Sequence, residues 1–194
     1  MSKFPLNFSR GNFMILLIDH YDSFTYNIVH YLKDFPLLVR HPQELDREEI
    51  HHYSHLILSP GPGHPKDCKV ALEILECYHK SKKILGICLG HQIIAYYFGS
   101  KIAGLSAPMH GKISKISMHQ GRLFTGIGEE FFVGRYHSLH VSDLKPPLRA
   151  CAYSDDGILM ALEHRDLPIF GLQFHPESIL SDFGKEILRN FVMQ

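Results

Sequence analysis

The fold of this chain is decided by the stretch Ile84-Leu85-Gly86-Ile87-Cys88-Leu89-Gly90-His91-Gln92. An apolar run of strand length leads into Cys88, which has a glycine two residues before it and another two residues after it. This pattern predicts a cysteine version of the nucleophile elbow, a tight turn from a strand into a helix. The helix N-terminus favours a thiolate and offers free backbone N–H groups. The alternative is a buried core cysteine between two glycines, since free cysteine is among the most buried residue types.

Strands and helices alternate along the first half of the chain. Short apolar runs predict buried parallel strands at Met14–Ile18, Leu37–Val39, His55–Ser59 and Ile84–Ile87. Periodicity and caps predict helices over Phe24–Tyr31 after Asp22 or Ser23, over Glu44–His51, from Asp67 to Tyr78, and over Gln92–Phe98. The alternation favours an α/β doubly wound sheet.

The pattern changes after Lys101, where strands follow one another with few helices between them. These strands are predicted at Lys112–Met118, Phe131–Val133, Leu148–Tyr153, Ile158–Glu163 and Ile169–Phe174. We expect them to extend the sheet in an antiparallel manner. A last helix is predicted to begin at Asp182, as its cap, and to end at Val192.

Composition narrows the class of protein. The 194 residues fit one domain over residues 13–194, preceded by a flexible extension over residues 1–12 that lacks a signal-peptide core. A net charge of zero and the lack of a basic patch argue against a nucleic-acid partner. The apolar runs are too short to span a membrane.

The cysteines and histidines do not indicate a metal site. Cys68, Cys77, Cys88 and Cys151 lack zinc-like or redox spacing, which favours a reduced cytoplasmic setting. His51, His52 and His55 cluster in a polar stretch without partners at ligand spacing, so solvated histidines are the better interpretation. We expect no metal and no cofactor.

Polar segments follow several of the predicted strands. Asp19–Ser23, Ser59–Gly63, Cys88 and Gln173–Glu177 all come directly after one. Ligands bind beyond the carboxyl ends of strands in such sheets, so these segments are expected to converge. The convergence favours a reactive Cys88 over a core cysteine.

A cysteine nucleophile needs a base and a group that orients the base. His175 is a candidate base and Glu177 its orienting carboxylate, although a solvated loop would explain His-Pro-Glu equally well. The N–H of Leu89 is a candidate oxyanion donor, with a second from Gly61 or Gly63. A plain tight turn is the alternative for that glycine loop, and its spacing disfavours nucleotide binding.

Three segments together resemble the class I, triad-type glutamine amidotransferases over about Met14 to Val192. They are Ser59-Pro-Gly-Pro-Gly63, Gly86-Ile-Cys-Leu-Gly-His-Gln92 and Gly171-Leu-Gln-Phe-His-Pro-Glu-Ser178. The resemblance implies a flavodoxin-like mixed sheet and glutamine hydrolysis through a γ-glutamyl thioester on Cys88, with His175 as base and Glu177 orienting it. The glutamine and oxyanion site would then comprise Gly61, Pro62, Gly63, Leu89, Gln92, Ser138 and Leu139.

The segment Asp19-His-Tyr-Asp-Ser-Phe-Thr-Tyr-Asn27 resembles the signature of the chorismate-using branch of that family. His110-Gly-Lys112 and Arg135–Val141 also resemble it. The resemblance implies a separate glutaminase subunit that passes ammonia to a chorismate-binding synthase subunit, for anthranilate or aminodeoxychorismate. His20 stands where the branch usually has Asn, and His140 where a small or apolar residue is common.

Three other functions stay open. A glutaminase subunit for carbamoyl-phosphate or GMP synthesis would keep the same chemistry, but the Tyr21–Asn27 signature argues against it. A non-catalytic scaffold would not need Cys88, His175 and Glu177 together. A thiol hydrolase acting on γ-glutamyl peptides shares the elbow, whereas Gln92 and the Ser138–Leu139 segment favour free glutamine.

Overall fold

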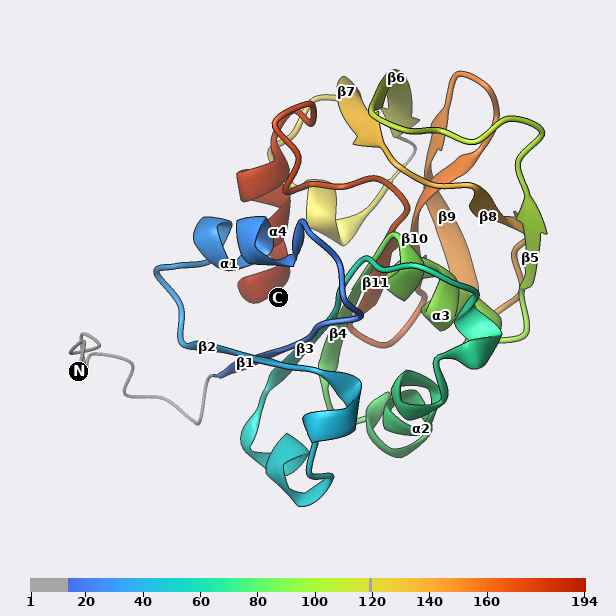
Figure 1. The fold of residues 1–194 in the computed structure, drawn as a ribbon. Helices are drawn as coiled ribbons and strands as arrows, with labels where there is room; N and C mark the ends of the chain where they lie inside the picture. The colour runs from blue at the N-terminus through green and yellow to red at the C-terminus, as the bar shows by residue number, and fades with distance from the viewer. Residues whose placement is uncertain (1–13, 119) are drawn as a thin grey trace.

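The structure is a computed structural model that describes residues 14–118 and 120–194 (Figure 1). The predicted extension over residues 1–12 lies outside the described residues, and the prediction of one domain over residues 13–194 stays a prediction. Among the described residues, no helix is both long enough and apolar enough to cross a membrane.

A nine-stranded sheet forms the centre of the molecule, in the order β2-β1-β3-β4-β11-β10-β9-β6-β7. Its parallel part comprises β1 (Ile15–Ile18), β2 (Leu37–Arg40), β3 (His55–Leu58), β4 (Lys83–Ile87) and β11 (Ile169–Leu172). Its antiparallel part comprises β6 (Lys112–Met118), β7 (Glu130–Arg135), β9 (Leu148–Ser154) and β10 (Leu159–His164). The predicted doubly wound sheet with an antiparallel extension is confirmed.

Helices cover both faces of the parallel strands, which explains their continuous apolar sequences. On one face, α1 (Thr25–Tyr31) and α4 (Gly184–Val192) pack in a core that includes Ile15 and Leu17. On the other, α2 (Lys69–Tyr78) and α3 (Leu89–Tyr97) pack in a core that includes Leu16 and Ile18. Figure 1 shows the two helix layers on opposite sides of the sheet.

Several predicted boundaries differ from the structure. The helix predicted over Glu44–His51 is wrong, because two 3₁₀-helices stand there, η1 (Pro42–Glu44) and η2 (Glu48–His52), separated by extended backbone at Leu45. The last strand ends at Leu172 rather than Phe174. The segments η3 (Pro65–Asp67) and η4 (Arg122–Phe124) are also short 3₁₀ turns.

The predicted helix caps are also wrong. Asp67 lies inside η3, and Cys68 stands at the N-cap of α2 without a side-chain hydrogen bond. Asp182 does not cap α4; its Oδ2 accepts from the N–H of Phe132 at 3.0 Å, and Phe183 occupies the N-cap with φ 55°. At α1 the N-cap is Phe24, whose N–H donates to Asp22 Oδ1 at 2.8 Å.

A second, two-stranded sheet was not predicted. It pairs β5 (Lys101–Gly104) with β8 (Leu139–Asp143) in an antiparallel manner. Both strands are largely half-buried or exposed and lack a clean alternation of apolar and polar residues, so the sequence carries no strand signal. This small sheet brings Leu139 toward the elbow.

Candidate active site

Cys88 stands at the tight turn between β4 and α3, as predicted. Its backbone has φ 51° and ψ −100°, a conformation that a residue with a side chain adopts only under strain. A Cβ at Gly86 would lie 2.3 Å from the backbone of Gly90, and one at Gly90 would lie 2.2 Å from Leu58 O. The two glycines therefore let strand and helix meet closely enough to form the turn.

His175 and Glu177 form a buried hydrogen-bonded pair just beyond β11. Nδ1 of His175 lies 2.7 Å from Oε1 of Glu177, and each residue is 2% exposed. The loop that carries them is anchored, since Ser181 Oγ donates to His175 O at 2.6 Å and the N–H of His175 donates to Gly134 O at 3.2 Å. The imidazole is thus held in one orientation.

The Cys88 thiol lies beside the imidazole of His175. Burial lowers the pKa of His175, but the interactions with Cys88 and Glu177 outweigh it and raise the pKa well above its ordinary value of 6.5. Nε2 of His175 makes no hydrogen bond of regular geometry in the structure. The tautomer with hydrogen on Nδ1 leaves Nε2 to take the thiol proton.

Gln173 contacts the candidate nucleophile, and the sequence analysis quoted it within a motif but assigned it no role. Its Nε2 lies 3.8 Å from Cys88 Sγ, and its Oε1 accepts from Gln92 Nε2 at 3.1 Å. Gln92 Nε2 also donates to Leu139 O at 2.9 Å. His137 Nδ1 lies 2.9 Å from the same carbonyl. This network joins the thiol, the elbow helix and the first residue of β8.

The Gly61–Gly63 loop packs directly on the elbow. A Cβ at Gly61 would lie 2.6 Å from His20 O and 3.1 Å from Leu89 Cδ2, so only glycine fits there. Pro62 and Gly63 are exposed, and Gly63 has φ 94°. The structure therefore brings this loop and Leu89 together. At the start of β8, the exposed Ser138 precedes Leu139.

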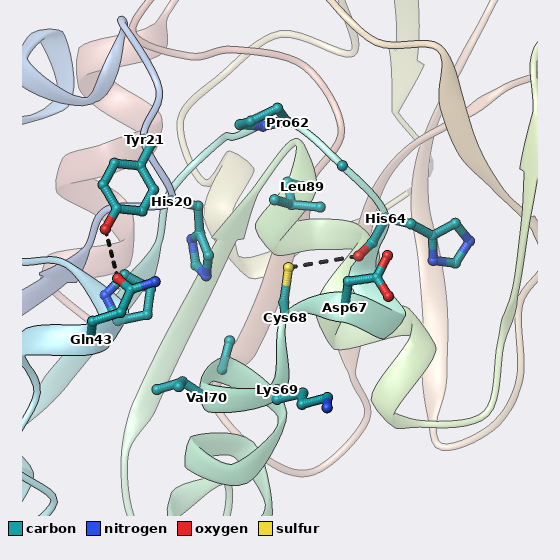
Figure 2. Close-up of a pocket in the computed structure, with 13 residues that line it drawn as sticks. His20, Tyr21, Gln43, Pro62, His64, Asp67, Cys68, Lys69, Val70 and Leu89 are labelled. Atoms are coloured by element: carbon teal, nitrogen blue, oxygen red, sulfur yellow. Dashed lines mark hydrogen bonds between the residues drawn. The ribbon is translucent and has the colours of Figure 1, made fainter.

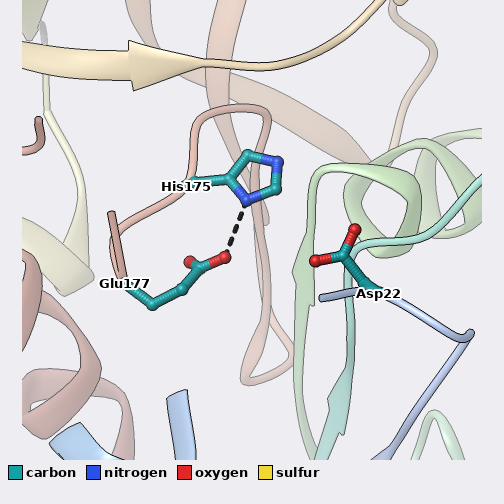
Figure 3. Close-up of side chains that lie close together, drawn as sticks. All are labelled: Asp22, His175 and Glu177. Carbon is teal, nitrogen blue, oxygen red and sulfur yellow. Dashed lines mark hydrogen bonds and ion pairs between the residues drawn. The ribbon is translucent and has the colours of Figure 1, made fainter. Parts of the chain in front are cut away.

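Asp22 belongs to the Asp19–Ser23 segment that was expected at this edge of the sheet, but the only role considered for Asp22 itself was that of a helix cap, and it lies beside His175 and Glu177. One oxygen of Asp22, one ring nitrogen of His175 and one oxygen of Glu177 lie within 4.8 Å of one another (Figure 3). The available signal was its place directly after the first strand. These atoms could surround a cation, but the 2.7 Å contact between His175 and Glu177 already pairs two of the three groups. The expectation of no metal stays a prediction.

Two aromatic rings flank the imidazole. The ring centroids of Phe24 and Tyr136 lie 5.4 and 5.0 Å from that of His175. Tyr136 Oη lies 3.1 Å from Ser178 Oγ, which fixes its ring. Such apolar cover reduces solvent around the imidazole and strengthens its interaction with Glu177.

Comparison with known proteins decides the family. The family model described as glutamine amidotransferase class-I matches residues 16–194. The chain belongs to this family. The resemblance read from the three sequence segments is confirmed.

Curated relatives match almost the whole of this chain. The chain is 44% identical to aminodeoxychorismate/anthranilate synthase component 2 of Bacillus subtilis, over 92% of this chain and 95% of that protein. It is 43% identical to anthranilate synthase component 2 of Azospirillum brasilense, again over 92% and 95%. It is 42% identical to the bifunctional protein TrpGD of Thermotoga maritima, where it covers only 32% of the longer chain.

Solved structures share the fold. A GMP synthase subunit from Thermoplasma acidophilum superposes with a TM-score of 0.85 at 26% identity, covering 93% of this chain and 92% of that one. A glutamine amidotransferase from Thermotoga maritima superposes with a TM-score of 0.69 at 19% identity, covering 87% and 77%. The predicted mixed sheet of the class I amidotransferases is confirmed.

Proposed function

We propose that this class I amidotransferase is a glutaminase subunit that delivers ammonia to a chorismate-using synthase partner. The observation that carries the glutaminase chemistry is the buried His175–Glu177 pair beside the strained Cys88 elbow. The relatives that are 43% and 44% identical, named for anthranilate or aminodeoxychorismate synthase, support the choice of partner.

The first half of the reaction forms a thioester. His175 Nε2 takes the proton of the Cys88 thiol, and the sulfur attacks the side-chain amide carbon of glutamine. The amide oxygen becomes an oxyanion, for which the N–H of Leu89 and the Gly61–Gly63 loop are the proposed donors. The C–N bond then breaks as the imidazolium gives its proton to the nitrogen, so ammonia leaves and a γ-glutamyl thioester remains.

The second half releases glutamate. His175 takes a proton from water, the hydroxide attacks the thioester carbon, and the C–S bond breaks as the sulfur regains the proton. Glu177 stabilises the imidazolium at each step. No cofactor enters this scheme.

Glutamine would be held between the elbow helix and β8. Gln92 uses its Nε2 to bind Leu139 O and Gln173, so its Oε1 is left to accept from the substrate amide. The backbone of Ser138 and Leu139 would bind the α-amino and carboxylate end. The carbonyl of Leu139 is already fixed by Gln92 and His137, which makes this end of the site preorganised.

The chemistry of ammonia is the reason for a partner. Ammonia released into bulk water becomes ammonium, which is not a nucleophile, so transfer requires a protected path into the synthase subunit. Relatives named for anthranilate synthesis and for both syntheses match this chain about equally well, so both products are compatible with the proposal.

The test uses the chain together with a synthase subunit that co-purifies with it from its native host. Cys88→Ala should abolish product formation from glutamine and chorismate, while synthesis from ammonium chloride and chorismate continues. Cys77→Ala, at an exposed cysteine, is the matched control and should retain both activities. Glutamine-dependent synthesis by Cys88→Ala would contradict the assignment of the nucleophile, and a co-purifying synthase that binds no chorismate would contradict the partner.

A further inference from the structure

Arg135, the last residue of β7, is a fully buried arginine whose guanidinium makes contacts in two directions. On one side, Nη1 donates to Ser114 Oγ in β6 at 3.1 Å and to the two carboxylate oxygens of Asp156, in the turn between β9 and β10, at 2.9 and 3.0 Å. On the other side, Nε donates to Nε2 of His137 at 3.2 Å. One side chain therefore joins the antiparallel part of the sheet to the segment that leads into β8.

The ion pair between Arg135 and Asp156 is a weak explanation for a buried guanidinium. The Asp156 side chain is 40% exposed, so water screens the pair. Nη2 of Arg135 is also buried without a hydrogen-bond partner among the described residues. Buried ion pairs can often be replaced by apolar residues with no loss of stability, because the desolvation of the charges offsets their attraction. The contact of Arg135 with His137 therefore indicates a role other than stability.

The contact with Arg135 determines which ring nitrogen of His137 carries the hydrogen. Burial lowers the pKa of His137 to about 4 and the charge of Arg135 adds to the shift, although the hydrogen bond to Leu139 opposes it, so the ring is neutral at pH 7. A guanidinium can only donate, so Nε2 of the neutral ring must be the nitrogen that accepts. The hydrogen is then on Nδ1, which lies 2.9 Å from Leu139 O and donates to it.

The carbonyl of Leu139 connects these contacts to the elbow. It accepts from His137 Nδ1 and from Gln92 Nε2, each at 2.9 Å, so both of its lone pairs are used. The other hydrogen of Gln92 Nε2 goes to Gln173 Oε1 at 3.1 Å, which holds the Gln92 amide in one orientation. In the other tautomer of His137, a bare Nδ1 would face the carbonyl oxygen, and two acceptors repel each other. The Leu139 carbonyl would then turn away and Gln92 would lose one of its two partners.

We propose that Arg135 is a positioning residue for glutamine binding. It fixes the tautomer of His137, and His137 in turn holds the Leu139 carbonyl and through it the amide of Gln92. Arginine suits this role because its planar fork donates toward Asp156 and toward His137 at once, whereas lysine has a single donor nitrogen. The proposal rests on the proposed glutaminase function, in which Gln92 and Leu139 bind the substrate.

The tautomer of His137 can be measured without any activity assay. Nitrogen-15 NMR of the full chain, labelled at histidine, distinguishes a protonated ring nitrogen from a bare one, and the signals lost in His137→Asn are those of His137. Wild type should carry the hydrogen on Nδ1 at pH 7, and Arg135→Met should show a mixture of both tautomers. A wild-type ring protonated at Nε2, or a folded Arg135→Met with the hydrogen still wholly on Nδ1, overturns the proposal.

The effect on the substrate is measured by the kinetics of glutamate release, with the co-purified synthase subunit present. Arg135→Met should raise the KM for glutamine about tenfold, the effect of one lost hydrogen bond. It should change kcat by less than about twofold, because the interaction is made equally with bound glutamine and with the transition state. Arg135→Lys keeps the charge and should show the same increase in KM. A folded Arg135→Met with the KM of wild type overturns the proposal.

His137→Asn tests whether Arg135 acts through the imidazole. The asparagine amide nitrogen takes the place of Nδ1 and donates to Leu139 O without help from an arginine, because an amide nitrogen is always a donor. His137→Asn and the double variant Arg135→Met/His137→Asn should therefore share one KM, within about twofold of wild type. A tenfold increase in KM that persists in the asparagine background overturns the proposal, because Arg135 would then act through packing.

Arg122→Met is the matched control for the loss of a well-bonded arginine. Nη2 of Arg122 donates to His164 O and to Leu167 O, each at 2.8 Å. Its loss should lower the stability of the chain and leave the KM for glutamine unchanged. An increase in KM equal to that of Arg135→Met would overturn the proposal, because general destabilisation would then explain both variants.

Lys69→Met is the matched control for the loss of a positive charge near the glutamine site. Lys69 is exposed and stands in the wall of a pocket of about 310 Å³ beside the Gly61–Gly63 loop (Figure 2). This variant should keep the KM of wild type, and a tenfold increase would overturn the specific role of Arg135. If wild type with its partner releases no glutamate, the glutaminase proposal fails, whereas the NMR measurement still decides whether Arg135 fixes the tautomer of His137.

Discussion

Gly90→Ala should push the elbow helix away from the sheet. The new Cβ would lie 2.2 Å from Leu58 O, 2.8 Å from Leu58 Cβ and 2.9 Å from Leu58 C. Two of these atoms belong to the backbone of β3, a central strand with neighbours on both sides. An ordinary contact needs 3.4 Å or more. Because the strand cannot yield easily, α3 must move by about 1 Å, within the range in which overpacked cores shift their backbone.

Two magnitudes follow from that displacement. Overpacking a tight core site costs about 1–3 kcal/mol, which lowers Tm by about 3–10 °C in a domain of this size. A shift of about 1 Å in a reacting group costs about 100-fold in rate, and Cys88 stands at the N-cap of the displaced helix. Thermal unfolding followed by circular dichroism and kcat/KM for glutamate release, with the partner present, measure the two effects.

Gly104→Ala is the matched control. Gly104 lies in β5, and a Cβ there would meet no atom within 4 Å. The free energy of unfolding of the Gly104→Ala variant should differ from that of wild type by less than about 0.5 kcal/mol. The reasoning is refuted if Gly90→Ala has the Tm and the kcat/KM of this control, because the close approach of β3 and α3 would then not hold the thiol in place.

Three further predictions concern the same centre. Glu177→Gln removes the carboxylate that helps to raise the pKa of His175, so kcat/KM should fall about 10²- to 10⁴-fold. The alkaline limb of the pH profile of kcat/KM should also move to lower pH, and an unchanged profile would contradict the pairing of His175 with Glu177. Gln173→Leu removes the contacts to Cys88 Sγ and Gln92 and should lower kcat/KM for glutamate release by up to about tenfold, with Gln120→Leu as the control at an exposed glutamine. Burial lowers the pKa of His91 to about 3, so the unfolded chain binds a proton near pH 6.5 that the folded chain does not bind, and stability falls as pH drops through that window. The free energy of unfolding that is lost through His91 between pH 7 and pH 5 is about 2 kcal/mol. Urea unfolding at both pH values should therefore show a decrease in stability that is smaller by that amount in His91→Asn than in wild type.

The meeting of Cys88 and His175 at one edge of the sheet could be predicted from the sequence, because both follow apolar strands and strand ends are where ligands bind in such sheets. The pairing of β4 with β11 could not be predicted. Their parallel register sets Ile87 opposite Leu172, which places Cys88 next to Gln173. Local patterns encode each strand, whereas packing across the whole chain chooses its neighbour. Gln173 was assigned no role for that reason.

The β5–β8 pair could not be predicted from local sequence patterns either. Val141 is the one fully buried residue of the two strands, too few to leave a clear period of two in the sequence, and their pairing joins residues near Lys101 to residues near Asp143. Ser138 and Leu139 therefore looked like an ordinary loop until the family resemblance singled them out. The contact from Gln92 Nε2 to Leu139 O is what ties this segment to the elbow.

The site divides into a rigid centre and a more adjustable margin. Cys88 and His175 follow β4 and β11, two adjacent strands inside the sheet, and both side chains are buried. The strain at Cys88, of order 1–3 kcal/mol, is held by the close packing of β3, β4 and α3 around the turn. The Gly61–Gly63 loop and β8 are instead largely exposed or half-buried. Substitutions at the centre should therefore lower kcat, whereas substitutions at the margin should act first on the KM for glutamine.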